Sequence, residues 1–377
     1  MSSSPKPSND ADAKVKAKEQ ASLRVTDDDL YRHSSQYRVW SFTPEQLTQK
    51  RAEINARATA KIEQGLRAFR ETHPDLTSEE LAAIDEKAVP VSTDEELLLV
   101  SYFARMILSF AGKMNLPTEV AATAVSFFRK FYLSNSVSEI SPKEVFHTAL
   151  FFSCKSENYF IGVESFAKKA KTNPNAVLKH EFKLLESLSF TLMNHHPYKA
   201  LHGFFLDIQS VLAGKVDMNY MGQVYTDCKK IITDALLTDA VYFYSPPQIT
   251  LAALLIADEA LTMRYLQLKF MITEESPTEN AQGEKQEPKE GTSIPVPGQK
   301  LLEVIKECKA IISNKVAPPK EEAVKVTAKI HYSQNPLTVL DRLKRQRESN
   351  STATTPGQTP VPEENQAKRQ KSDGTTD

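Results

Sequence analysis

Lys155 and Glu181 are the charged residues whose positions in this sequence most need an explanation. Lys155 ends a largely apolar segment that is predicted to be a helix, and Glu181 lies in a later predicted helix. A lysine at a helix C-terminus complements the helix dipole, and a glutamate on a helix is usually a solvated surface carboxylate. Taken alone, both residues favour these ordinary structural roles.

The common catalytic and cofactor-binding motifs are absent from the sequence. HExxH, GxSxG, GxxxxGK[ST], GxGxxG and CxxC do not occur. His195-His196 precedes Pro197 without a neighbouring carboxylate, which favours a cap or linker over a metal site. The three cysteines, Cys154, Cys228 and Cys308, are far apart and are predicted to be reduced, partly buried thiols. We therefore expect no catalytic residue, no metal and no cofactor.

Length and composition favour an intracellular helical protein of two or three domains. The chain has 377 residues and 40% hydrophobic residues, and its 11 glycines are few for a strand-rich protein. Lys and Arg number 47 and Asp and Glu 48, a net charge of −1 that disfavours a nucleic-acid-coating protein. No apolar run is long enough to span a membrane, and the N-terminus lacks the apolar region of a secretion signal.

An internal repeat sets the domain organisation. Ser141-Pro142 opens one predicted helix and Ser245-Pro246 opens another, an offset of 245 − 141 = 104 residues. Similar residues match at this offset on both sides, and a repeat of this length indicates two related domains in tandem. Lys155 is an exception, because its counterpart at +104 is Glu259.

Apolar periodicity predicts five helices in each repeat, and hence an all-α fold. The first repeat is assigned to residues 92–193 and the second to residues 196–317. The helix predicted from residue 117 to 133 is apolar on most sides, which indicates a bundle wrapped around a central helix. The fifth helix is predicted to start near Asn173 and to carry the apolar residues Val177, Leu178, Phe182, Leu185, Leu188 and Phe190.

Flanking segments differ in character from the repeats. Residues 1–30 and 349–377 are polar and predicted to be disordered, residues 274–298 are predicted to be a flexible insertion, and residues 318–348 a helical segment. Residues 31–91 form an aromatic arm and a helix with one narrow apolar stripe, which should dock on another element. The stripe is Leu47, Ile54, Ala58, Ile62, Leu66 and Phe69. Basic clusters near residues 342–347 and 368–371 are either nuclear-import signals or solubilising charge.

Two stretches around the charged residues resemble the cyclin family. Residues 149–157, Ala-Leu-Phe-Phe-Ser-Cys-Lys-Ser-Glu, are similar to the cyclin-box stretch that ends in Lys-x-Glu. Residues 181–190 resemble the family pattern Glu-x-x-x-Leu-x-x-Leu-x-Phe. Residues 31–43, 128–137, 237–240 and 244–249 are most similar to the cyclin of the CDK-activating kinase, and the resemblance extends from about residue 31 to 330. Asn158 departs from it, standing where an acidic residue is common.

The resemblance implies two tandem cyclin boxes and a function as a kinase regulator. It assigns Lys155, Glu181 and Glu157 to the binding of a cyclin-dependent kinase near its mobile αC helix, through the first box. It leaves open whether the arm residues Tyr37, Trp40 and Phe42 contact the kinase or only the cyclin core. The implied assembly includes a RING-finger assembly factor and the core of general transcription factor IIH.

The same resemblance implies a nuclear protein that is not itself an enzyme, with no membrane and no direct nucleic-acid partner. The implied substrates of the complex are CDK activation loops and the C-terminal domain of RNA polymerase II. The alternative is a nucleic-acid-bound general transcription factor, because transcription factor IIB also carries two cyclin-like repeats. That reading predicts a basic face and a zinc ribbon, and neither is evident in the sequence.

Overall fold

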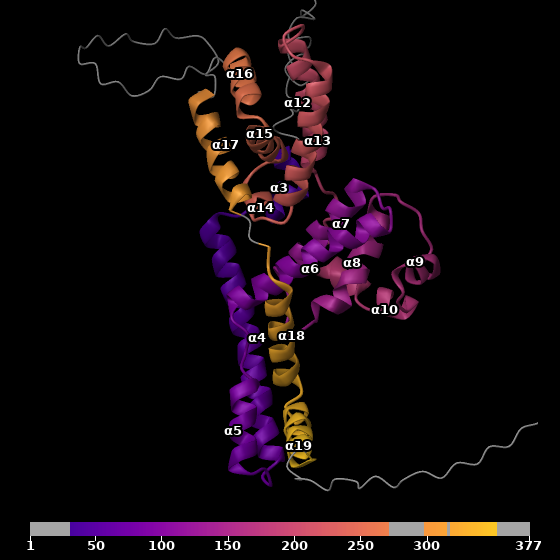
Figure 1. Ribbon diagram of the computed structural model, residues 1–377, viewed down its shortest axis with the longest axis vertical. Coiled ribbons are helices and arrows are strands. Elements are labelled where there is room, and N and C mark those ends of the chain that lie inside the picture. Colours follow the sequence, from indigo (N-terminus) through magenta and orange to yellow (C-terminus); the bar gives the residue numbers. More distant parts are fainter. Residues whose placement is uncertain (1–30, 271–297, 315–316, 353–377) are drawn as a thin grey trace, which may run out of the picture.

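The computed structural model describes residues 31–270, 298–314 and 317–352, and the regular elements in these ranges are all α-helices (Figure 1). The all-α fold predicted from the sequence is confirmed for this part of the chain. None of the described helices combines the length and the apolar character that a membrane span requires. The disorder expected at residues 1–30, and most of that expected at 274–298 and 349–377, falls outside the described ranges.

The first repeat is a bundle around a buried central helix. In chain order its helices are α6 (Thr93–Lys113), α7 (Thr118–Phe131), α8 (Pro142–Ser156), α9 (Val163–Ala170), α10 (Pro174–Leu178) and α11 (Glu181–Ser187). α7 packs against α6, α8 and α11. Its Phe127, Phe128 and Phe131 side chains are fully buried, which confirms the central helix predicted from its apolar sequence.

One predicted helix of the first repeat is divided in two. The sequence pattern gives a single helix after Asn173, but a turn at Lys179 and His180 separates α10 from α11. Both side chains turn to Glu144 of α8: Lys179 Nζ and His180 Nε2 lie 2.5 and 2.8 Å from its Oε2 atom. This shared carboxylate holds the turn against α8.

Several apolar residues of this segment lie outside the core. Phe182 and Phe190 are 74% and 64% exposed, and Leu178 is also exposed. The fully buried residues are Val177, Leu184 and Leu188. Because α10 and α11 are separate helices, a single helical period drawn through both misplaces the buried face.

The second repeat has a similar bundle around α15. Its helices are α12 (Pro197–Val211), α13 (Met218–Ala235), α14 (Ala240–Phe243), α15 (Pro246–Ala257), α16 (Glu259–Phe270) and α17 (Gly298–Ser313). The helix predicted over residues 245–261 ends early, because Asp258 is extended (φ −154°, ψ 101°). Its carboxylate accepts a hydrogen bond from the Leu261 amide at 3.0 Å, which caps α16.

The helices that flank the repeats form a stalk. α4 (Pro44–Thr72) and α5 (Ser78–Lys87) lie beside α18 (Lys320–Gln334) and α19 (Leu337–Thr352), below the repeats in Figure 1. They enclose a small second core built on Ile84, Ala88, Val339 and Leu340. α19 ends at Thr352, so its last residues, 349–352, extend into the segment where disorder was expected.

The narrow stripe of α4 docks as the sequence predicts, but on two different cores. Leu47, Ile54 and Ala58 are buried near the repeats, and Leu47 belongs to the main core. Leu66 and Phe69 are half-buried against the second core, in the stalk. α4 therefore connects the stalk to the repeats.

One ion cluster joins α4 to both repeats. Asp239, which precedes α14, accepts two hydrogen bonds from Arg51 of α4, at 2.8 and 2.7 Å, and one from Arg129 of α7 at 2.7 Å. The Arg129 side chain is only 5% exposed and also donates to the carbonyls of Leu236 and Thr238. Burial raises the pKa of Asp239, but the Arg51 hydrogen bonds and the two guanidinium charges outweigh it and hold the pKa below its ordinary value.

We expect Asp239→Asn to destabilise the protein by roughly 3–5 kcal/mol, because it leaves the buried Arg129 charge uncompensated. Since the folded pKa is depressed, the carboxylate contributes stability above its unfolded pKa of about 4, and that contribution is lost as pH falls through the lower folded pKa. Denaturant unfolding at neutral and acidic pH measures both effects. The exposed Glu259→Gln variant is the control, and equal stability of the two variants would contradict the prediction.

Candidate partner-binding face

Lys155 and Glu181 meet on one face of the first repeat. Lys155 lies in the last turn of α8 and Glu181 is the first residue of α11, and Nζ of the lysine forms an ion pair with Oε1 of the glutamate. Their side chains are 48% and 24% exposed. Lys155 Nζ also lies 4.7 Å from the centroid of the Phe151 ring. Each charge complements the dipole of its own helix end, so the local structural role expected from the sequence is compatible with this pairing.

Exposed apolar side chains follow both members of the pair in the chain. Phe160 is 91% exposed after α8, Phe182 is 74% exposed beside Glu181, and Phe190 and Met193 are 64% and 69% exposed after α11. Large exposed apolar side chains around a charged centre are typical of a protein interface. Phe182 lies off the buried face that Leu184 of α11 shares with the C-cap residue Leu188, but only the break before α11 shows which residues belong to that helix.

Backbone conformation holds Phe190 outward. Ser189 and Phe190 both have left-handed φ values, 51° and 56°, which are costly for residues other than glycine. Their amides donate to the carbonyls of Glu186 and Leu185 at 2.9 and 3.2 Å. Two successive strained residues persist only where surrounding contacts hold them. The conformation of the turn after α11 is therefore fixed by its contacts with the rest of the protein.

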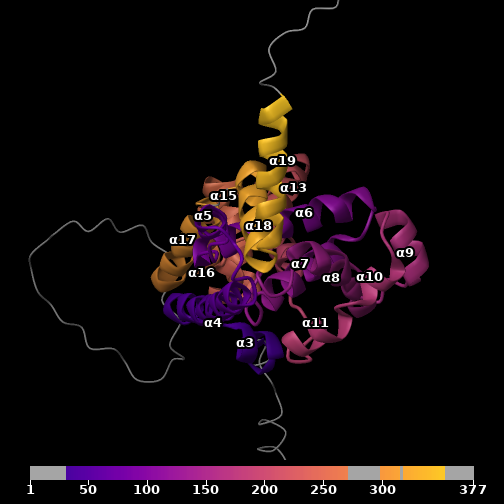
Figure 2. The same ribbon diagram turned by 90° about the horizontal axis from the view of Figure 1, so that it is seen from below.

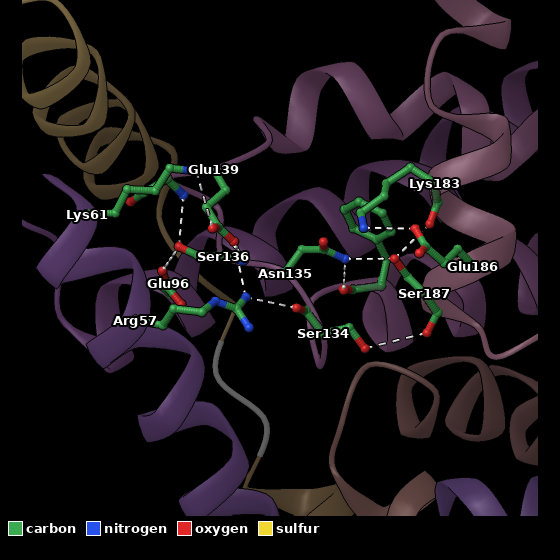
Figure 3. A network of polar contacts seen from close by, with 12 residues as sticks. Arg57, Lys61, Glu96, Ser134, Asn135, Ser136, Glu139, Lys183, Glu186 and Ser187 are labelled. Carbon is green, nitrogen blue, oxygen red and sulfur yellow. Dashed lines mark hydrogen bonds and ion pairs between the residues drawn. The ribbon is translucent and has the colours of Figure 1, made fainter. Parts of the chain in front are cut away.

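A polar network fixes the end of α11 (Figure 3). Asn135 Nδ2 donates to Ser187 Oγ at 2.8 Å, and the carbonyl of Ser134 accepts from Arg57 of α4 at 3.0 Å. Arg57 also pairs with Glu139 at 3.2 Å. The loop after α7 therefore connects α4 to α11, the helix that carries Glu181.

Glu157 does not lie with the other two predicted kinase-binding residues. It is half-buried, and its Oε1 accepts a hydrogen bond from Thr123 Oγ1 of α7 at 2.6 Å. The same hydroxyl lies 2.6 Å from His196 Nε2. The chain bends after α8 so that Glu157 joins the two repeats, while Lys155, two residues earlier, points to the exposed face.

The aromatic arm is seated on the core. Trp40, which ends α3 (Ser35–Trp40), is 4% exposed, and its Nε1 donates to Thr191 Oγ1 at 2.8 Å. The amide of Phe42 donates to the carbonyl of Tyr242 in the second repeat at 3.0 Å. Tyr37 is 41% exposed. Figure 2 shows α3 close to α11.

Comparisons with known proteins agree with this architecture. Residues 78–193 match the N-terminal cyclin domain and residues 196–313 match the cyclin C-terminal domain. Cyclin CCL1 of Saccharomyces cerevisiae is 52% identical over 362 residues, which cover 88% of each chain. A putative cyclin-H of Dictyostelium discoideum is 30% identical over 59% of this chain and 74% of that protein.

This chain belongs to the cyclin family. The resemblance to the cyclin family seen in the sequence is confirmed by these relatives, among which cyclin-H proteins occur. One chain of a yeast TFIIK (Kin28/Ccl1/Tfb3) structure is 52% identical, with a TM-score of 0.57 over 75% of this cyclin and 100% of that chain. One chain of the Chaetomium thermophilum CAK complex bound to ATP-γ-S is 27% identical, with a TM-score of 0.67 over 89% and 99%.

In the described part of the second cyclin repeat, the counterpart of Lys155 forms a different ion pair. Glu259, the sequence counterpart of Lys155, begins α16 instead of ending α15, and pairs with Lys309 of α17 at 2.9 Å. The three cysteines are buried, as expected, and burial raises the pKa values of Cys154, Cys228 and Cys308 to about 11, 12 and 12. Among the described residues, no group of three or more His, Cys, Asp or Glu side chains is placed to hold a metal.

Lys130 is a buried residue that the sequence analysis did not single out. Its side chain reaches from α7 into the junction between the repeats, where Nζ donates to Asn194 Oδ1 at 2.8 Å and lies 5.3 Å from the centroid of the Trp40 ring. Burial lowers the pKa of Lys130 to about 7. The arm therefore covers a lysine whose positive charge has lost most of its hydration.

His196 should make cyclin stability depend on pH. Burial, followed by the charges of Lys130, His195 and Lys199, lowers the pKa of His196 to about 3, whereas an unfolded histidine titrates near 6.5. Because the folded pKa is depressed, the stabilisation is present above about pH 6.5 and is lost as pH falls toward 3, by up to about 1.4 kcal/mol per pH unit.

The variant His196→Gln should flatten this part of the pH dependence, because glutamine does not titrate and can still donate to Thr123. Unfolding free energies measured between pH 7 and pH 4 provide the slope. The control is His202→Gln, at an exposed position of α12. An unchanged slope in His196→Gln would show that this imidazole is not the group responsible.

Proposed function

We propose that this cyclin is the regulatory subunit of a CDK-activating kinase. The observation that carries the proposal is the 52% identity to CCL1 across 88% of both chains, together with a solved TFIIK assembly of Kin28, Ccl1 and Tfb3. By this likeness its partners are a cyclin-dependent kinase and a RING-finger assembly factor. The kinase supplies the catalytic residues, and the cyclin supplies none.

The pair Lys155–Glu181 would be the centre of the kinase-binding face, as the family resemblance implies. In the free cyclin each charge is neutralised by the other while remaining partly exposed. A kinase that offers its own charged groups can therefore exchange partners with the pair. The exposed Phe182 and Phe190 would provide the apolar anchors, because aromatic side chains carry much of the binding energy of protein interfaces.

Binding would activate the kinase by shifting a conformational equilibrium. An isolated kinase holds its αC helix in an unproductive position, and the active position completes a Lys–Glu ion pair that orients the ATP phosphates. A rigid helical face that binds only the active position stabilises it. A difference in affinity of a few kcal/mol between the two states is enough to make the active one predominant.

The substrates, the larger assembly and the location of the complex would be those of CDK-activating kinases. The active kinase would phosphorylate the activation loops of other CDKs and the C-terminal domain of RNA polymerase II, within transcription factor IIH and in the nucleus. Association with the transcription factor IIH core would pass through the kinase and the assembly factor. Direct nucleic-acid binding, as in a transcription factor IIB-like protein, has no specific observation in its favour.

Reversing either charge of the pair should weaken kinase binding. We expect Lys155→Glu and Glu181→Lys each to cost roughly 2–5 kcal/mol of binding free energy, because each places a like charge against the other member and an unmatched one against the kinase. Purified Kin28, the kinase named in the yeast complex, is a suitable partner, with affinity measured by calorimetry.

The doubly reversed variant, with Lys155→Glu and Glu181→Lys, separates the intramolecular role of the pair from its binding role. It restores the ion pair and should restore stability, but not affinity. Glu259→Lys, at the counterpart position in the second repeat, is the matched control and should bind like the wild type. Wild-type affinity in both single reversals would remove the assigned site.

A further inference from the structure

The segment that follows α11 is held from behind by the N-terminal arm. Trp40 Nε1 donates to Thr191 Oγ1 at 2.8 Å, and Thr191 Oγ1 donates in turn to the Leu188 carbonyl at 2.6 Å. Four residues later, the His195 amide donates to Gln36 Oε1 at 2.6 Å, and Gln36 Nε2 donates back to the His195 carbonyl at 3.3 Å. The arm thus fixes both ends of residues 191–195.

The same segment carries exposed apolar side chains on its outer side. Phe190 directly precedes Thr191, and Met193 lies between the two points of attachment, with 64% and 69% of their surfaces exposed. Lys130 adds a third attachment through Asn194 Oδ1 at 2.8 Å, and it lies under the Trp40 ring. The turn is therefore held at three points while the Phe190 and Met193 side chains remain exposed.

We propose that the arm is a positioning element that presets Phe190 and Met193 for kinase binding, with Trp40 and Thr191 as the positioning residues. The inference rests on the proposed function, because it takes the face around Glu181 to be the kinase-binding face. It answers the question that the sequence left open: the arm residues Trp40 and Gln36 influence the kinase through the turn after α11.

Preorganisation of the turn lowers the energetic cost of binding. Ser189 and Phe190 occupy left-handed backbone conformations that a free turn would leave for more favourable ones. If the kinase had to restore them on binding, part of the binding energy would be spent on ordering the turn. The hydrogen bond from Trp40 removes that cost beforehand, since it anchors the residue immediately after the strained pair.

A separate network holds the end of α11 that precedes the turn. Ser187 accepts a hydrogen bond from Asn135, and the loop after α7 that carries Asn135 is itself bound to Arg57 of α4 (Figure 3). Loss of the Trp40 contact would leave that network intact. The predicted defect is therefore local to residues 189–195, and helix content should be preserved.

Trp40→Phe and Thr191→Val test the positioning role in the full-length cyclin. Trp40→Phe removes the indole donor, and Thr191→Val removes the acceptor together with the hydrogen bond to the Leu188 carbonyl. Each should weaken binding of purified Kin28 by at least about fivefold, the typical effect of one lost hydrogen bond. Thr191→Ser retains the hydroxyl and should bind as the wild type does. Circular dichroism verifies that the variants are folded.

A double-mutant cycle with Phe190→Ala distinguishes positioning from general stability. If Trp40 acts through the turn, Trp40→Phe should cause at most a twofold further loss of affinity once Phe190 is alanine, although it lowers the melting temperature equally in both backgrounds. An equal fivefold loss in both backgrounds, or none in either, would overturn the inference while leaving the proposed function intact. If Phe190→Ala and Lys155→Glu both bind normally, the kinase-binding face itself is misassigned and the inference fails with it, although the chain still binds the kinase.

Discussion

A single carboxylate, Asp239, joins the first repeat, the second repeat and α4. Asp239 receives guanidinium groups from α4 and from the central helix of the first repeat, while its own position is in the second repeat. Arg129 is nearly fully buried, and a buried charge without a counter-ion is strongly unfavourable. The counter-ion of Arg129 is present only when α7 and the segment before α14 lie together, and Arg51 adds α4 to the same contact. The stalk is thereby connected to both repeats through α4.

The two repeats share a fold, but only the first carries the charged pair. In the first repeat α8 continues through Lys155, so the lysine reaches the start of α11. In the second, Asp258 ends the corresponding helix one residue before the counterpart Glu259, and the glutamate starts a new helix and pairs with α17. A one-residue helix break thus redirects an equivalent position from a partner-facing role to an internal one.

The sequence was sufficient for the parts of the structure that depend on local pattern. Helical periodicity predicted the central α7, the offset of 104 residues predicted the tandem repeats, and the narrow stripe of α4 predicted a docking helix. It was insufficient where a distant contact decides the local outcome. Glu144 holds the turn between α10 and α11, which places Phe182 outside the core, and Thr123 turns Glu157 inward. Both contacts join residues more than 30 positions apart.

The two ionic sites differ in a way that suits their roles. The two cations differ most, because the Arg129 side chain is 5% exposed and that of Lys155 is 48% exposed. Breaking the contacts of Arg129 leaves a charge that solvent cannot reach, whereas Lys155 stays accessible to water, and ion pairs at exposed positions contribute little to folding, about 0–1 kcal/mol. A pair that contributes little to the fold can exchange its internal partner for one on another protein at small cost. The cluster of Arg129 and Asp239 therefore stabilises the fold, and the pair Lys155–Glu181 is available to a binding partner.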